Sequence, residues 1–271
     1  MKKIIFAASA LAAGAMASAA VVVAHRGENT LAPQNSLESA NIAWSNGVKY
    51  VEGDFWEIAD GEIICMHARA ELKKYAGLEV DDIAKLTMAD IKKLDLANND
   101  MWRGKFRNVK IPTMREIMAT VPKDGTLVFE IKNYTPAYAK KVDDARKAAG
   151  IPVKNIILIS FNADALADFK KQFGEYKTLW LYALKNKNGK LNFTPQEAIA
   201  KCREINADGV DVGGTPLLGA QYVNEVKAAG LDFYVWTVNR PDDILRMKKL
   251  GVDGITTDTA YEALRILSRA K

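Results

Sequence analysis

Short apolar runs alternate with longer amphipathic segments along most of the chain. Each run is rich in Val, Ile, Leu or aromatic residues and predicts a buried strand, while the segments between them have the helical period. This alternation is typical of a parallel sheet with helical crossovers. We expect strands at 21–26, 49–55, 126–132, 155–160, 177–183, 209–212, 233–238 and 253–257, and helices near 35–46, 137–149, 162–173, 194–206, 217–229 and 241–250.

Several helix boundaries carry their own signals. Thr194-Pro195 and Pro241 suit the first turn of a helix, and Gly150, Gly230 and Gly251 suit the position that follows one. Eight parallel strands joined by helices favour a closed barrel over an open sheet. The fold class we predict is therefore α/β, a (β/α)8 TIM barrel.

One strand breaks the alternation. An apolar run at 62–67 follows the strand region 49–58 almost directly, and the dipeptide Asp60-Gly61 just before it is a strong hairpin signal. Two residues cannot join parallel strands, so this pair is expected to be antiparallel. A two-residue loop would place Asp54 opposite His67. A longer loop would shift that register but keep the two residues close.

The segment 68–112 resembles a barrel least and is predicted to be a small insertion after the second strand, over the mouth of the barrel. Thr87 and Asp90 have the spacing of a capping box, which predicts a short helix to about residue 94. The polar stretch 98–110 predicts a loop. Trp102 within it could stack on a substrate or anchor the packing.

Residues 1–19 have the pattern of a secretory signal peptide. A basic start precedes an apolar stretch at 4–16, and Ala17-Ser18-Ala19 is a small-x-small cleavage site. We therefore expect an exported protein, periplasmic or secreted, with a single domain over 20–271. No later run is long enough to predict stable membrane insertion.

The charge pattern limits the classes of binding partner, and the cysteine content bears on disulfides. Removing Lys2 and Lys3 leaves 36 basic and 33 acidic side chains, so the formal charge falls from +5 to +3. The basic residues are dispersed, which argues against nucleic acid and leaves a small anionic molecule as the expected partner. Cys65 and Cys202 are expected to be buried thiols, with a disulfide between them as the alternative. The sequence does not indicate an oligomeric state.

Candidate chemical groups gather where the predicted strands end, which is where barrel enzymes place their active sites. They are His25 and Arg26 on the first strand, Glu52 and Asp54 on the second, His67 on the hairpin strand, and Glu130 and Lys132 on the strand at 126–132. Singly, each has an ordinary alternative: a core histidine, a solvated strand face, or a plain ion pair. Asp211 and Asp258 also lie near strand ends but are assigned no role.

The ordered set of motifs resembles the glycerophosphodiester phosphodiesterase family, part of the phospholipase-C-like phosphodiesterase barrels. Each motif alone is weak, but together they run through the whole mature chain. The matching stretches are His25-Arg26-Gly27, Pro33-Gln34-Asn35-Ser36, Glu52-Gly53-Asp54, Asp60-Gly61, His67, Ile111-Pro112-Thr113, Glu130-Ile131-Lys132, Ser160-Phe161, Trp236-Thr237-Val238-Asn239 and 251–258.

This resemblance implies a role for each candidate. His25 and His67 would be the catalytic general acid and base. Arg26 and Lys132 would bind the substrate phosphate.

The resemblance also implies that Glu52, Asp54 and Glu130 bind one divalent cation. Three oxygen ligands without a nearby cysteine favour a hard ion, Mg²⁺ or Ca²⁺, over zinc. A bound cation and fixed positive side chains would stabilise the charge that a phosphodiester develops during cleavage.

Two positions depart from the family pattern. Gln34 stands where glutamate is usual, and Ala68 stands where aspartate usually follows the second histidine. The predicted function is metal-dependent hydrolysis of glycerophosphodiesters to glycerol 3-phosphate and an alcohol. The alternatives are a phospholipase-D-like activity on lysophospholipid or sphingomyelin, or a protein that binds phosphodiesters without cleaving them.

Overall fold

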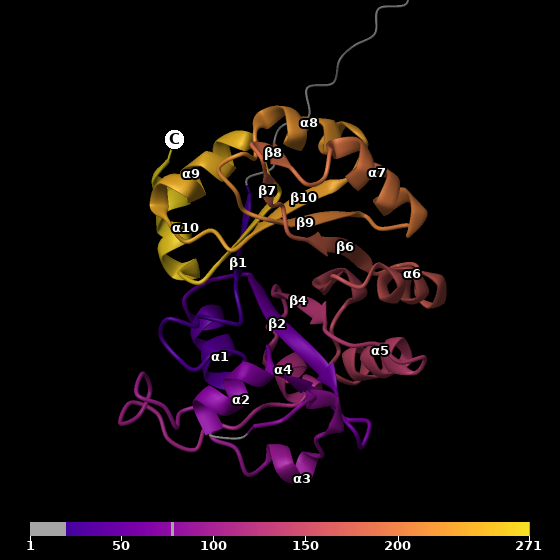
Figure 1. Ribbon diagram of the computed structural model, residues 1–271. Coiled ribbons are helices and arrows are strands. Elements are labelled where there is room, and N and C mark those ends of the chain that lie inside the picture. The colour runs from indigo at the N-terminus through magenta and orange to yellow at the C-terminus, as the bar shows by residue number, and fades with distance from the viewer. Residues whose placement is uncertain (1–19, 77–78, 271) are drawn as a thin grey trace, which may run out of the picture.

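A computed structural model describes residues 20–76 and 79–270, and the predicted signal peptide lies outside this range. The chain forms a closed barrel of parallel strands surrounded by helices (Figure 1). Strand β1 pairs with both β2 and β11, which closes the ring and confirms the predicted TIM barrel. The barrel strands are β1 (Val21–Ala24), β2 (Tyr50–Glu57), β4 (Thr126–Ile131), β5 (Ile156–Ser160), β6 (Lys177–Tyr182), β9 (Gly209–Gly213), β10 (Asp232–Trp236) and β11 (Gly254–Thr257).

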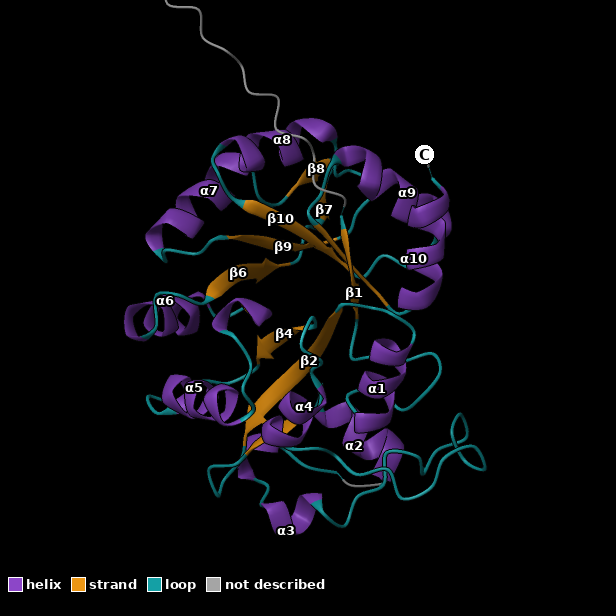
Figure 2. Ribbon diagram, turned by 180° about the vertical axis from the view of Figure 1, so that it is seen from behind, coloured by secondary structure: helices purple, strands orange, loops and turns teal. Residues whose placement is uncertain are grey.

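Helices cover the outside of the barrel, as the view from behind also shows (Figure 2). The predicted ones are confirmed with shifts of up to three residues at their ends, and two more, α4 and α10, were not predicted. They are α1 (Leu37–Ser45), α4 (Met114–Thr120), α5 (Tyr138–Ala148), α6 (Ala163–Gln172), α7 (Pro195–Glu204), α8 (Ala220–Ala228), α9 (Pro241–Leu250) and α10 (Ala260–Arg269). A two-stranded hairpin, β7 (Asn186–Lys187) with β8 (Lys190–Leu191), was also not predicted.

The predicted boundary signals act as expected. Thr194 caps α7 in a capping box with Glu197, and Pro195 occupies its first turn. Gly251 ends α9 in the left-handed conformation, with φ 76°. This conformation costs little for glycine because it has no Cβ atom.

The hairpin strand β3 (Ile63–Cys65) is antiparallel to β2, as predicted, but its register differs by one residue. Phe55 pairs with Cys65, and the Met66 amide donates to the Asp54 carbonyl oxygen. The expected pairing of Asp54 with His67 is therefore wrong. The turn closes between Ile58 and Glu62 with Gly61 at φ 82°, so the loop has one residue more than a two-residue hairpin.

The insertion builds a small hydrophobic core of its own. It contains α2 (Arg69–Ala76), a 3-10 turn (Ile83–Lys85) and α3 (Met88–Ile91). Their apolar side chains pack with Trp102 against residues at the ends of β2 and β3, so Trp102 is a packing anchor. Figure 2 shows α3 at the periphery, beside the barrel. The apolar positions of this part bind it to β3, and its expected place over the mouth stays a prediction.

Two apolar layers hold the barrel. The larger one lies between strands and helices, where the Phe55 and Phe129 rings stack at 3.8 Å between centroids. A second cluster fills the barrel interior and includes Val23, Val128 and Leu179. This interior cluster packs beneath the polar side chains at the carboxyl ends of the strands.

Candidate active site

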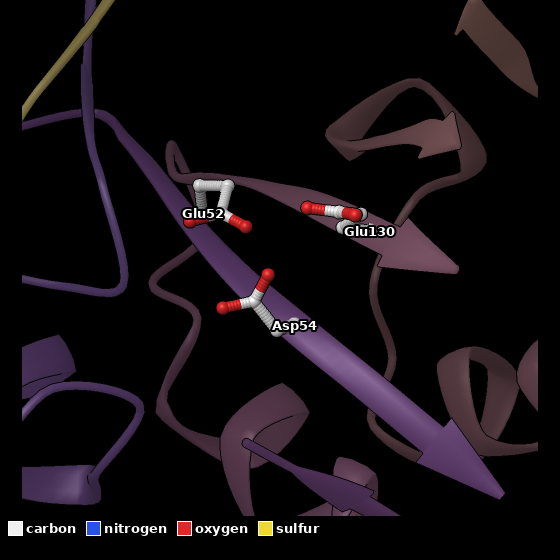
Figure 3. A group of neighbouring side chains, drawn as sticks. All are labelled: Glu52, Asp54 and Glu130. Carbon is white, nitrogen blue, oxygen red and sulfur yellow. The ribbon is translucent and has the colours of Figure 1, made fainter. Parts of the chain in front are cut away.

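Three carboxylates converge at the carboxyl ends of β2 and β4. Alternation along β2 turns Val51 and Phe55 toward the helices, so Glu52 and Asp54 point into the barrel. The parallel register places Asp54 beside Glu130 of β4. One oxygen of each of the three carboxylates lies within 4.8 Å of the others, and all three residues are buried (Figure 3).

The pKa values of the three carboxyl groups are shifted in different directions. Burial, followed by the negative charge of Asp54, raises the pKa of Glu130 to about 8. Burial and the neighbouring carboxylates also raise the pKa of Glu52 well above its usual value. Burial acts the same way on Asp54, but Lys132 and Arg26 outweigh it and hold the pKa of Asp54 below its usual range.

Two cations partly neutralise this triad. Lys132 Nζ lies 2.8 Å from Asp54 Oδ1 and 2.7 Å from Glu130 Oε1. Arg26 Nε lies 3.2 Å from Asp54 Oδ2. The predicted plain ion pair between Glu130 and Lys132 is therefore present, but when all three carboxylates are ionised the two cations leave one negative charge.

Glu52 has a buried oxygen atom that no described side chain or backbone group satisfies. Its Oε2 accepts a 2.8 Å hydrogen bond from the Arg26 amide, whereas the buried Oε1 has no hydrogen-bond partner among the described residues. A buried anionic oxygen without a partner is costly. The triad could therefore hold a divalent cation, which would satisfy Glu52 and relieve the repulsion among the three carboxylates.

The turn after β1 delivers Arg26 to the triad. Arg26 has φ 58° and Gly27 has φ 78°, so the chain reverses sharply where the strand ends. A Cβ atom on Gly27 would lie 2.5 Å from Ser39 Oγ, so only glycine fits there. The guanidinium also donates to Gln34 Oε1 at 2.9 Å. Gln34 thus still accepts a hydrogen bond from Arg26, but without the charge that glutamate would bring.

His25 is oriented by a carboxylate from the last barrel strand. Its Nδ1 lies 2.7 Å from Asp258 Oδ1, because β1 pairs with β11 and the two residues follow the paired strand ends. Asn29 and Asn239 donate to the same carboxylate. Burial opposes ionisation, but His25 and these amides keep the pKa of Asp258 below its usual value. Asp258, which was assigned no role, is thus the partner of His25.

His67 has a partner of its own on helix α2. Its Nδ1 lies 3.1 Å from Glu71 Oε1, one helical turn further along the chain. Its backbone carbonyl accepts a hydrogen bond from Trp56 Nε1 at 3.1 Å. A carboxylate therefore contacts the ring although Ala68 supplies none. The i, i+4 spacing of His67 and Glu71 was visible in the sequence and was not used.

The predicted residues line one cavity of about 190 Å³. His25 and His67 both face it, with Arg26, Lys132, Glu52 and Glu130, whereas Asp54 lies just beneath. The opposite walls are apolar, apart from Asp211 and two threonines. They consist of Ile159, Phe161, Leu181, Asp211, Trp236, Thr237 and Thr256. Cys65 and Cys202 are buried free thiols, as expected.

Buried carboxylates, two cations and two imidazoles at the carboxyl ends of barrel strands define a barrel enzyme suited to phosphate esters. The model of the glycerophosphoryl diester phosphodiesterase family matches residues 25–261, and the chain belongs to this family. It is accordingly a phosphoric diester hydrolase.

Individual relatives span nearly the whole chain. A glycerophosphodiester phosphodiesterase of Caldanaerobacter subterraneus subsp. tengcongensis is 28% identical over 92% of this chain and 98% of its own length. A crystal structure of such an enzyme from Parabacteroides distasonis is 27% identical, covers 93% of this chain and 98% of that one, and has a TM-score of 0.71. A phosphodiesterase of Oleispira antarctica, solved with its product sn-glycerol-3-phosphate, is 22% identical, with a TM-score of 0.74 and coverage of 92% and 97%; it supports the fold.

Asp211 predicts a dependence of stability on pH. Burial raises its pKa to about 8, from 3.8 for the ordinary side chain. Between these values the folded state keeps a proton that the unfolded chain has lost, so this residue lowers stability as pH rises and has no further effect above pH 8. Asp211→Asn should match the wild type near pH 4 and exceed its free energy of unfolding by about 1–3 kcal/mol near pH 8.

Urea unfolding between pH 4 and 9 measures this difference. The matched control is Asp143→Asn, because Arg146 and Lys147 overcome burial and lower the pKa of the Asp143 carboxylate to about 2. That variant should instead be less stable than the wild type at neutral pH. An Asp211→Asn variant no more stable than the wild type at pH 8 would show that burial does not raise the pKa of Asp211.

Proposed function

We propose that this protein is a metal-dependent enzyme that hydrolyses glycerophosphodiesters to glycerol 3-phosphate and an alcohol. The observation that carries the proposal is that two oriented histidines line the same cavity as Glu52 and Glu130, two members of the carboxylate triad. The named activity of the Caldanaerobacter relative and the product bound by the Oleispira enzyme support the choice of substrate.

One cation, Mg²⁺ or Ca²⁺, would be held by Glu52, Asp54 and Glu130 and, when bound, would stabilise negative charge on the phosphoryl oxygens. The two ions share a preference for oxygen ligands, and the triad offers only carboxylates. Arg26 and Lys132 line the cavity beside the triad and would bind the same phosphate.

The histidines would move the protons. In each ring a carboxylate faces Nδ1, which places the Nδ1 proton there and leaves Nε2 for the substrate. One Nε2 would accept the proton of the attacking hydroxyl group, and the other ring, in its protonated form, would give a proton to the departing alkoxide. The same pair serves whether water or a neighbouring substrate hydroxyl attacks the phosphorus.

The small cavity favours a small substrate. Its volume of about 190 Å³ lies below the roughly 300–1,000 Å³ that is common for drug-sized ligands. A glycerophosphoryl group is therefore a better match than a whole lysophospholipid or sphingomyelin.

We also propose that the protein is exported, on the strength of the 1–19 pattern in its sequence. Mass spectrometry of the native protein would then show a chain that starts near Ala20. In the part of the chain that the structure covers, no helix is both long and apolar enough to cross a membrane.

The test of the reaction is release of glycerol 3-phosphate from glycerophosphocholine and glycerophosphoethanolamine. Release should stop on chelation and return when Mg²⁺ or Ca²⁺ is added, because the triad alone repels an anionic substrate. Release of free choline with phosphatidic-acid-like products from lysophospholipid would favour the phospholipase-D-like alternative. Substrate recovered intact after long incubation with metal would favour a binding protein.

The histidines have a direct mutational test. His25→Ala and His67→Ala should each lower kcat by about 10²–10⁴-fold, the usual contribution of a general acid or base. Circular dichroism and the unfolding temperature control for the fold. Full activity in either variant would remove that residue from the mechanism.

Glu71 tests the positioning of His67. Glu71→Gln keeps the shape of the side chain but removes the charge that holds the Nδ1 proton, so kcat should fall about 10–100-fold with a small change in KM. The pH profile of kcat should change as well, because Glu71 faces the ring that is proposed to move the proton. Glu71→Asp should recover part of the rate. Unchanged kcat and pH profile in Glu71→Gln would show that this contact is structural only.

A further inference from the structure

Asp211 is a buried acid in the cavity that the proposed mechanism does not use. It lies on β9 and is 1% exposed. Its backbone carbonyl accepts a hydrogen bond from Trp236 Nε1 at 3.2 Å, which fixes the main chain but leaves the side chain free. The Oδ1 atom has no hydrogen-bond partner in any described part of the chain.

The barrel order places Asp211 away from the carboxylate triad. The strands follow one another as β1, β2, β4, β5, β6, β9, β10 and β11, so β9 stands across the barrel from β2. The strands on either side of β9 contribute Leu181 and Tyr234 at the level of Asp211. The cavity thus has a charged wall with the triad and, opposite it, an apolar wall with one carboxyl group.

Among the described residues, no contact of this carboxyl group offsets the free-energy cost of burying it. A buried polar atom without a hydrogen bond lowers stability, and a carbon side chain of similar size would pack better against Leu181 and Trp236. A buried polar group without a hydrogen bond is found mainly at functional sites, where a bound ligand can satisfy it. A ligand that brings a hydrogen-bonding group to the apolar wall would satisfy Asp211.

The chemistry of the wall selects a neutral hydroxyl group over an ammonium group. Burial favours the protonated form of Asp211, with a pKa of about 8, and Tyr234 on β10 is the titratable group beside it. A protonated carboxyl group both donates and accepts hydrogen bonds, as a hydroxyl group does. It offers an ammonium group no opposite charge.

We propose that Asp211 is the binding residue for a hydroxyl group of the glycerol moiety, while the phosphate lies at Arg26 and Lys132. This assignment rests on the proposed function, because it takes the ligand to be a glycerol phosphate ester. Asp211 then distinguishes a polyol phosphate from an alkyl phosphate of the same length.

Calorimetry in the presence of Mg²⁺ or Ca²⁺ tests this with sn-glycerol 3-phosphate, n-propyl phosphate and phosphoethanolamine. Wild-type protein should bind glycerol 3-phosphate about 10- to 100-fold more tightly than propyl phosphate, the difference expected for one or two buried hydrogen bonds. Asp211→Leu should remove this preference and keep the affinity for propyl phosphate. Asp211→Asn, which can still donate and accept, should keep most of the preference.

Asp143→Asn is the matched control, since Asp143 is also a buried carboxylate but lies on α5, outside the cavity. It should leave the preference unchanged. A preference that persists in Asp211→Leu would overturn the glycerol site alone, and so would tighter binding of phosphoethanolamine that Asp211→Leu abolishes. Wild-type protein that binds neither glycerol 3-phosphate nor propyl phosphate would overturn the proposed function together with this site.

Discussion

Three carboxylates share one buried space at the rim of the barrel, and the folded chain must compensate their repulsion. Lys132 and Arg26 do so only in part, because both pair with Asp54 and neither reaches the free oxygen of Glu52. A divalent cation would complete the compensation. The positive φ of Arg26 and the close packing of Gly27 serve this arrangement, since they turn the guanidinium toward Asp54.

The two histidines are also held by carboxylates. Each imidazole faces a carboxylate that is not part of the triad: Asp258 for His25, and Glu71 for His67. Glu71 also lies 3.5 Å from the Arg26 guanidinium, so helix α2 connects the second histidine to the side of the cavity that Arg26 lines. The insertion therefore contributes to the site through its first helix, while the rest of it packs beside the barrel.

Local patterns predicted the barrel and most of its site. Strand periodicity and the spacing of Glu52 and Asp54 place both acids on the inner face, and parallel pairing brings Glu130 next to them. Properties that depend on the exact turn or on distant chain segments were missed. The hairpin register failed because Gly61 allows a longer loop. The predicted closure of the barrel makes Asp258, after the last strand, a neighbour of His25, after the first, but no local pattern in the sequence indicates that their side chains meet.

The central claim is that Glu52, Asp54 and Glu130 hold a cation beside the two histidines. The most direct measurement is anomalous diffraction from crystals soaked in Ca²⁺. We expect one ion about 2.3–2.6 Å from an oxygen atom of each carboxylate, with Glu52 Oε1 among its ligands. A calcium ion bound elsewhere, with Lys132 still between Asp54 and Glu130 and Glu52 Oε1 unliganded, would contradict it.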